Sequence, residues 1–344
     1  MIVGGIVMLL NGAVAAVPVD IAVAHSITPF ITTYPWSSAG FGTKYANPGT
    51  NPGSLSAGCT FSPSGNALAV CSNSSPYISA YAWSASGFGA KFANPATLPT
   101  SSGRAVVFLP TNTEVAVAHI GSPYISVYPW SGAGFGTKFS NPGTLPTGNG
   151  NGVAFSPAGT EIAVSHVSSP FITTYPWSGS GFGTKFANPG TLPTGNGQSV
   201  AFSPAGTEIA VTHNTLPCVS AYPWSASGFG TKFANPASPM ATRSFGVAFS
   251  PAGTEIAIGG GVSPWIFAYP WSASGFGTKF ANPATTPSNN GTGVAFSPAG
   301  TEIAVSAQAT PFVLAYPWSA SGFGTKFANP ATLPASDGQG VAFS

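Results

Sequence analysis

The sequence has few charged residues. Its 344 residues include only 9 Lys or Arg and 7 Asp or Glu, which is 5% of the chain and a net charge of +2, whereas soluble proteins usually carry about a quarter. Nucleic-acid binding depends on clustered Lys and Arg that neutralise phosphates, and no such cluster occurs. We therefore expect no nucleic-acid partner.

Motifs for chemistry are also scarce. The three cysteines form no paired metal-binding motif, and neither a nucleophile elbow nor a phosphate-binding loop occurs. The apolar run at the start has about ten residues, too few to span a bilayer. The sequence alone therefore predicts no catalytic residue, no metal, no cofactor and no membrane span.

A strict repeat of 47 residues runs along the chain. Tryptophan recurs at this spacing without insertion or deletion, and 44 glycines and 34 prolines mark frequent turns. The tryptophans are Trp36, Trp83, Trp130, Trp177, Trp224, Trp271 and Trp318. Seven strand-rich units of this length are typical of a closed ring of four-stranded blades. We predict an all-β, seven-bladed β-propeller.

The fourth copy divides into four short strands at its Gly, Pro and Ser clusters. We expect strand a at 153–156, strand b at 161–165, strand c at 171–177 and strand d around 185–187. The recurring Phe, Tyr and Trp residues are expected to pack one blade against the next. The alternative, a ring of sugar-stacking tryptophans, would require exposed indoles.

The stretch FSPAGTEIAV, preceded by Gly-Val-Ala, resembles the hairpin of WD-repeat and YVTN-type propellers. The resemblance covers about residues 17–344 and implies the same ring fold. Ala158 replaces the turn Asp of the family pattern, and Pro176 stands where a WD repeat has its Asp. The hydrogen-bonded tetrad of true WD repeats is therefore not expected.

The two ends of the chain predict how the ring closes. The first copy lacks a strand a, whereas the chain ends with an extra one at 340–344, so the C-terminal strand should complete the first blade. Residues 16–344 then form the propeller, as seven units of 47. Residues 1–15 form an apolar leader that resembles a secretory signal; a non-repeat strand packed on the propeller and a truncated gene start are the alternatives.

The copies differ mainly in two connections, b-to-c and d-to-a. Strand direction alternates, so both should emerge on one face around the central channel, where a rigid ring can present varied binding loops. The alternative is that these longer loops bind nothing and their sequences have drifted without constraint. The candidate ligand- or partner-binding residues on this face are His25, Asn73, Arg104, His119, His166, His213, Asn214, Arg243 and Asp337.

Two features of these candidates bear on chemistry. The four histidines occupy one slot at the end of strand b in separate blades, too far apart to share one metal ion, so we expect solvent-facing loop histidines. Each glutamate begins strand b, about 17 Å from the histidine that ends it. Cys59 and Cys71 flank one turn and could form a disulfide, although free buried thiols are preferred.

These features favour a non-enzymatic scaffold that binds a protein or a glycan through the varied face. The charge-poor surface, rich in Ser, Thr, Asn and Gly, suggests an extracellular or virion-associated location. One alternative is a hydrolase resembling propeller lactonases, with a site at the channel mouth. Such enzymes use carboxylates near the channel, where the sequence offers only Asp337. Another alternative is a purely architectural virion or surface component.

Overall fold

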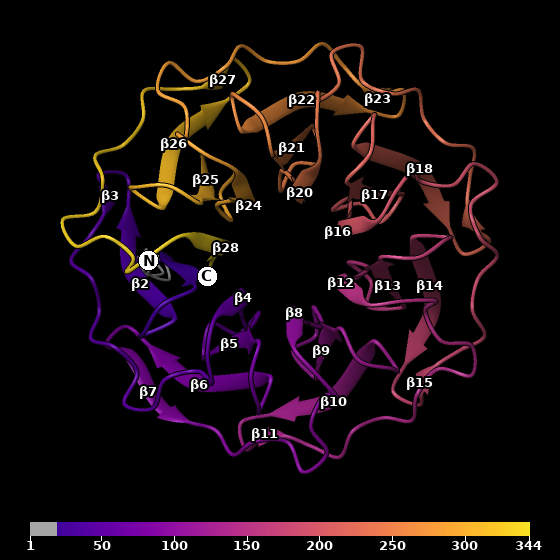
Figure 1. Ribbon diagram of the computed structural model, residues 1–344, viewed down its shortest axis with the longest axis horizontal. Coiled ribbons are helices and arrows are strands. Elements are labelled where there is room, and N and C mark those ends of the chain that lie inside the picture. The colour runs from indigo at the N-terminus through magenta and orange to yellow at the C-terminus, as the bar shows by residue number, and fades with distance from the viewer. Residues whose placement is uncertain (1–18) are drawn as a thin grey trace, which may run out of the picture.

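The computed structural model describes residues 19–344, so both the leader at 1–15 and the predicted boundary at residue 16 fall outside the described residues. Seven four-stranded antiparallel sheets form a ring around a central channel (Figure 1). The C-terminal strand pairs with the first strand of the chain and completes blade 1, as predicted. No helix in the described range is long and apolar enough to cross a membrane.

Each blade runs from an innermost strand a to an outermost strand d. Strands a are β28 (Gly338–Phe343), β4 (Ser56–Phe61), β8 (Gly103–Phe108), β12 (Gly150–Phe155), β16 (Gly197–Phe202), β20 (Ser244–Phe249) and β24 (Gly291–Phe296). Strands b are β1 (Val19–His25), β5 (Ala67–Ser72), β9 (Glu114–His119), β13 (Glu161–His166), β17 (Glu208–His213), β21 (Glu255–Gly260) and β25 (Glu302–Ala307).

The outer half of each blade contains strands c and d. Strands c are β2 (Ile31–Ser37), β6 (Ile78–Ser84), β10 (Ile125–Ser131), β14 (Ile172–Ser178), β18 (Val219–Ser225), β22 (Ile266–Ser272) and β26 (Val313–Ser319). Strands d are β3 (Gly40–Phe41), β7 (Gly87–Lys91), β11 (Gly134–Phe135), β15 (Gly181–Phe182), β19 (Gly228–Phe229), β23 (Gly275–Phe276) and β27 (Gly322–Phe323).

Strands a to c of the fourth copy lie within one to three residues of the predicted ranges, but strand d does not. The ladder on the outer edge is only Gly181–Phe182, earlier than the expected 185–187. One further backbone bond, from Phe186 N to Thr174 O (3.0 Å), continues the pairing. Lys185 Nζ donates to Asn188 Oδ1 (2.5 Å) in the connection that follows.

Aromatic side chains join the blades, as predicted. Trp177 is 4% exposed, and its ring packs edge-to-face on Phe155 and Phe182 of its own blade and on Phe139 of the preceding one. Because the seven tryptophans are between 4% and 8% exposed, they cannot serve as sugar-stacking platforms. Such T-shaped pairs add roughly 0.5–1.5 kcal/mol each to the area that they bury.

Tyrosines of strand c add hydrogen bonds between blades. The Tyr175 hydroxyl donates to Thr144 O of the preceding blade (2.7 Å). The equivalent bond from Tyr34 to Thr332 O (2.7 Å) crosses the point where the ring closes. Blade 1 is therefore held to blade 7 by the same contact that holds internal neighbours.

Candidate functional site at the channel mouth

The b-to-c and d-to-a connections lie together on one face, as predicted. In blade 1, Ser26 of the b-to-c connection donates through its backbone N–H to Ser336 Oγ of the d-to-a connection (3.1 Å). In the next blades, Ser102 Oγ donates to Asn73 O (2.8 Å), and Thr100 Oγ1 donates to Ser122 O (2.8 Å). The two kinds of loop therefore form one hydrogen-bonded rim around the channel.

Each strand a carries a β-bulge close to this rim. In β12 the pairing with β13 shifts between Gly150 and Gly152, so Asn151 has no partner in the ladder. The same slot is bulged in the other six blades. We call these residues the channel ring: Ala57, Arg104, Asn151, Gln198, Phe245, Thr292 and Gln339. A bulge redirects a side chain away from the ladder and is common next to active sites.

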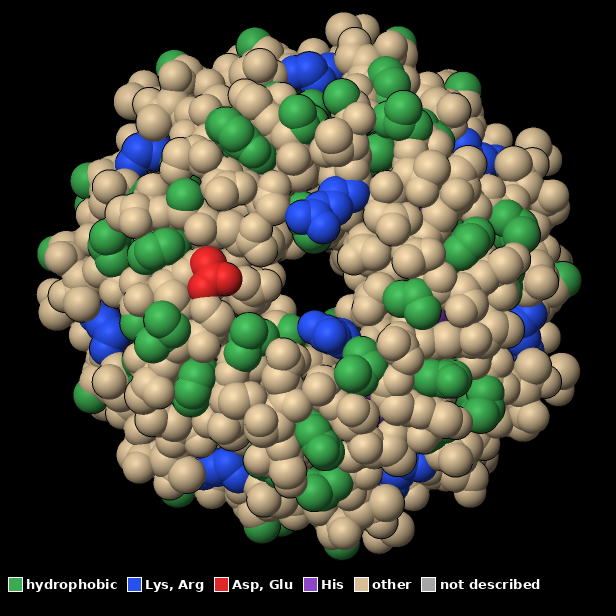
Figure 2. Space-filling model, in the orientation of Figure 1, with side chains coloured by type: hydrophobic (Ala, Val, Ile, Leu, Met, Phe, Trp, Pro, Cys, Tyr) green, Lys and Arg blue, Asp and Glu red, His purple; other side chains and the backbone are tan. Residues whose placement is uncertain are grey.

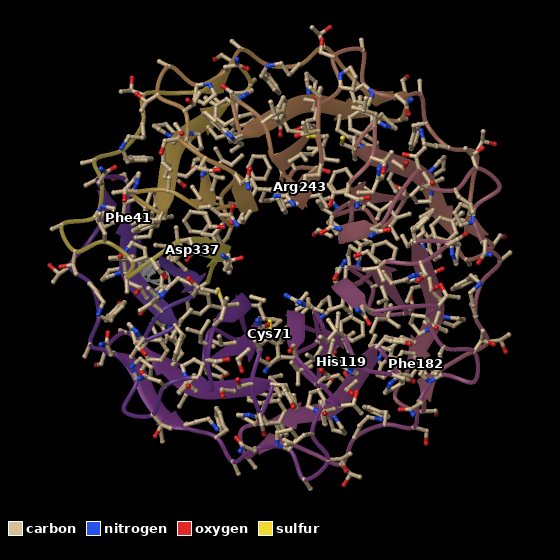
Figure 3. The ribbon with its side chains drawn as sticks, in the orientation of Figure 1. Phe41, Cys71, His119, Phe182, Arg243 and Asp337 are labelled. Atoms are coloured by element: carbon tan, nitrogen blue, oxygen red, sulfur yellow. The ribbon has the colours of Figure 1, made fainter. Side chains whose placement is uncertain are left out.

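The channel ring lines a cavity of about 350 Å³. All seven of its residues contribute, and each is half-buried. Two arginines and one carboxylate belong to this region. Arg104 is part of the ring, whereas Arg243 and Asp337 lie at the rim of the opening (Figure 3). Blue and red side chains border the opening on this face (Figure 2).

The three charged residues differ in how they are held. Arg104 Nε is buried and finds no hydrogen-bond partner among residues 19–344. The Arg243 guanidinium is exposed and lies 4.9 Å from the centre of the Phe245 ring, a cation–π contact that keeps it beside the channel. Asp337 accepts hydrogen bonds from Ser26 Oγ and from Gln339 Nε2 (2.7 Å). These bonds place a carboxylate beside the channel ring.

The prediction of solvent-facing histidines is wrong. All four are fully buried in the structure, because the b-to-c connection folds over the end of strand b. The Nε2 atom of each histidine lies 2.9–3.1 Å from a Ser or Thr hydroxyl on strand c. Burial lowers the pKa of all four to about 4. They are therefore neutral packing residues and do not line the channel cavity.

The copies without histidine show how this slot is packed. His166 contacts Thr173 (2.9 Å). Where the sixth copy has Gly260, strand c carries Phe267, whose ring would lie only 2.8 Å from a Cβ added to the glycine. Where the seventh copy has Ala307, strand c carries Leu314, and both are buried. In these two copies an apolar pair thus replaces the polar pair. The second copy instead has Ser72 and Ser79 in these slots, and the buried Ser79 hydroxyl has no hydrogen-bond partner among the described residues.

The two predicted asparagines lie on the rim and not in the cavity. Asn73 is half-buried, and its backbone N–H donates to Leu55 O (2.9 Å). Asn214 is exposed, and its Oδ1 accepts from Thr215 Oγ1 (3.3 Å). Neither residue lines the channel cavity.

Cys59 and Cys71 are free thiols, and burial raises the pKa of each to about 12. Within the described residues, no group of three or more His, Cys, Asp or Glu could hold a metal ion. The cavity therefore offers arginine, amide and hydroxyl groups as ligand contacts, and not a thiolate.

Sequence reasoning found Arg104 but missed the rest of the channel ring. The available signal was a single slot between two small residues that holds six different residue types in seven copies. Gln308, at the start of the last b-to-c connection, also lines the cavity and was missed. Its backbone N–H and its side chain both bond to Asn290 of the d-to-a connection.

The fold and this site define a seven-bladed β-propeller with a polar cavity at one channel mouth. No protein-family model matches the sequence, and neither does any curated protein. Among solved structures, the chain resembles a candidate 6-phosphogluconolactonase from Bacteroides uniformis, with 16% identity and a TM-score of 0.74 over 95% of this chain and 99% of the other. It also resembles the periplasmic gluconolactonase of Pseudomonas aeruginosa, with 15% identity and a TM-score of 0.69 over 94% and 99% of the two chains.

These similarities correct the sequence-based expectation of a non-enzymatic scaffold. The solved propellers named here, together with a candidate 6-phosphogluconolactonase from Bacteroides fragilis (14% identity, TM-score 0.70, 97% and 100% coverage), are described as lactonases. None of these three is described as a glycan-binding protein, a protein-binding scaffold or a virion component. At such identities the likeness establishes the fold, and an activity must be argued from the residues of this chain.

Proposed function

We propose that the protein is a hydrolase that opens a small, hydroxylated, negatively charged lactone at the channel mouth. The observation that carries this proposal is the position of the charges that break the repeat. Arg104, Arg243 and Asp337 are the only charged residues outside the periodic slots of the sequence, and all three lie at this mouth. In a chain of near-identical copies, random sequence drift would not be expected to place all three charged residues at the same mouth of the channel.

The arginines favour an anionic ligand. A guanidinium presents several donors in a fixed plane and binds carboxylate or phosphate groups with two parallel hydrogen bonds. Arg104 lines the cavity and brings such a guanidinium to its wall. The amides and hydroxyls of the channel ring, such as Gln198 and Thr292, suit the hydroxyl groups of a sugar-derived ring.

Asp337 suits the role of the base. The carboxylate takes a proton from a water molecule as the water oxygen attacks the lactone carbonyl carbon. An arginine stabilises the negative charge that develops on the carbonyl oxygen. The ring C–O bond then breaks, and the proton passes from Asp337 to the leaving alkoxide. The product is a hydroxy acid with one carboxylate more than the substrate.

A pH-stat assay of lactone opening, corrected for spontaneous hydrolysis, tests the proposal. We expect faster opening of 6-phosphogluconolactone than of uncharged gluconolactone, because the arginines favour an anion. Asp337→Asn should lower kcat by about 10²-fold or more. Arg243→Ala should lower kcat/KM by about 10²-fold. Lys232→Ala is the charge-matched control, because Lys232 bonds to Asn235 outside the cavity; no acceleration of either lactone above background would refute the proposal.

The proposal includes a location outside the cytoplasm. It is supported by the charge-poor surface and by the periplasmic gluconolactonase among the similar structures. Fractionation of the native cells, followed by detection of the protein with an antibody, tests this part separately.

A further inference from the structure

The face opposite the channel mouth carries a ring of a-to-b turns that touch one another. A Cβ placed on Gly206 would lie 3.5 Å from Pro157 Cδ of the preceding blade, and the same approach is made by Gly253 to Pro204. Gly300 repeats it with Pro251, at 3.4 Å. These three turns therefore rest on the proline of the preceding turn, and in blade 4 a Cβ placed on Gly159 would approach Leu109 Cδ1 instead (3.2 Å).

The turn of blade 2 lacks this contact with a preceding turn. Gly65, the equivalent glycine of blade 2, would have nothing within 4 Å of an added Cβ. The reason is topological: blade 1 is built from β28 and β1, which come from opposite ends of the chain and are not joined by an a-to-b turn. Between Pro298 of blade 7 and Gly65 of blade 2, the described residues leave a gap.

An apolar cavity of about 620 Å³ fills this gap. Its walls include the side chains of Phe61, Trp83, Phe108 and Phe343. Its one acidic side chain, Asp20, is already engaged, because it accepts hydrogen bonds from Trp83 Nε1 (2.8 Å) and from the Tyr45 hydroxyl (2.8 Å). The cavity therefore favours an uncharged, apolar occupant.

The chain itself contains a segment of this chemistry that is attached at the cavity edge. Asp20 lines the cavity, so the polypeptide before Val19 starts from its wall. The sequence of residues 1–18 has no charged side chain and is rich in Ile, Val, Leu and Ala. In the 47-residue register, Ala16 occupies the slot of Pro157, and Pro18 occupies that of Gly159, so in the sequence this segment corresponds to the missing a-to-b turn.

We propose that residues 1–18 bind in this cavity and close the ring of turns. The segment then takes the place of the a-to-b turn of blade 1 and covers the aromatic walls. The proposal is independent of the lactonase assignment, because the cavity lies on the opposite face from the channel ring.

Photocrosslinking of the full chain tests this proposal. The photoreactive amino acid p-benzoylphenylalanine is placed at Ser64, on the exposed turn beside the cavity, and the crosslinked peptides are identified by mass spectrometry. The matched control places it at Ala205, the same turn position in the fifth copy, where the ring of turns is closed. We expect intramolecular crosslinks from position 64 to peptides within residues 1–18 and none from position 205.

A second variant pair keeps the test specific. Leu9→Asp combined with Leu10→Asp should lower the crosslink yield by about tenfold or more, because burying carboxylates in an apolar cavity is unfavourable, whereas Asn11→Asp should lower it less. Three results would overturn the proposal: an intact mass that shows residues 1–15 removed, crosslinks that join two copies of the chain, or a yield at position 64 no higher than at position 205.

Discussion

Two slots of the repeat vary between copies, and the structure gives the variation opposite meanings. In the histidine slot the apolar replacements of the sixth and seventh copies are matched on strand c: His166 faces Thr173, whereas Gly260 faces Phe267. In the channel ring no such match exists, because the bulge removes each residue from the ladder. Variation between copies therefore indicates a candidate site only where neighbouring residues do not compensate for it.

The largest expected effect concerns the pH dependence of stability. Burial lowers the pKa of His166 and its three equivalents to about 4, below the ordinary value of 6.5. Between these pH values the unfolded chain binds more protons than the native state, so the free energy of unfolding falls as the pH drops from about 6.5 to about 4. Each histidine contributes a slope of up to about 1.4 kcal/mol per pH unit.

Urea unfolding at several pH values measures this slope. Changing one pair to the apolar pair of the seventh copy, with His166→Ala and Thr173→Leu, should remove about a quarter of the histidine contribution. A slope that stays the same in this double variant would mean that His166 titrates alike in the native and unfolded states, and the contrast with the channel ring would lose its basis.

The next effect compares a substitution opposite the histidine slot with the same substitution made together with its matching change in the slot. Thr173→Leu alone leaves His166 Nε2 without its hydroxyl partner and crowds the slot, so it should lower the free energy of unfolding by about 2–4 kcal/mol. The double variant with His166→Ala should cost less than the sum of the two single variants, with a coupling of about 1–3 kcal/mol. Urea titration at pH 7.5 of all four proteins completes the cycle; additive effects would contradict the matched-pair interpretation.

The repeat predicted the ring and the inter-blade aromatics, because both depend on periodic apolar positions. The extra strand a at the C-terminus predicted how the ring closes. The repeat did not predict the bulges, since a bulge depends on the pairing register and local sequence shows only flanking small residues such as Gly150 and Gly152. Burial of the histidines was missed because it depends on how the b-to-c connection folds over strand b. The covarying residue seven positions later, such as Thr173, could have indicated it.

A smaller effect tests whether the loss of unfolding free energy on substitution depends on the hydrogen-bond partner of a side chain and not on its residue type. Tyr175 and Tyr81 occupy the same slot and are both buried, but only Tyr175 has a hydrogen-bond partner for its hydroxyl among the described residues. Tyr175→Phe should lower the free energy of unfolding by about 1 kcal/mol. Tyr81→Phe should change it by less than about 0.5 kcal/mol or raise it; equal losses in thermal and urea unfolding would show that the partner is irrelevant.

The smallest expected effect on stability belongs to the channel ring. Gln198 is half-buried, and its side-chain nitrogen donates only to Asn196 O (3.2 Å) in the adjacent connection. Gln198→Ala should change the free energy of unfolding by less than about 0.5 kcal/mol. Asn151→Ala in the same slot should cost about 1 kcal/mol, because Asn151 donates to Gly197 O of the next blade (2.8 Å).

Both channel-ring variants should weaken binding of an anionic lactone, by about three- to tenfold in KM, since each removes one polar group that lines the proposed site. The combination of a near-zero change in urea unfolding and a raised KM for Gln198→Ala is the signature of a residue kept for a ligand. A loss of stability as large as that of Thr173→Leu would instead place the channel ring with the histidine slot, as packing, and remove the contrast between the two.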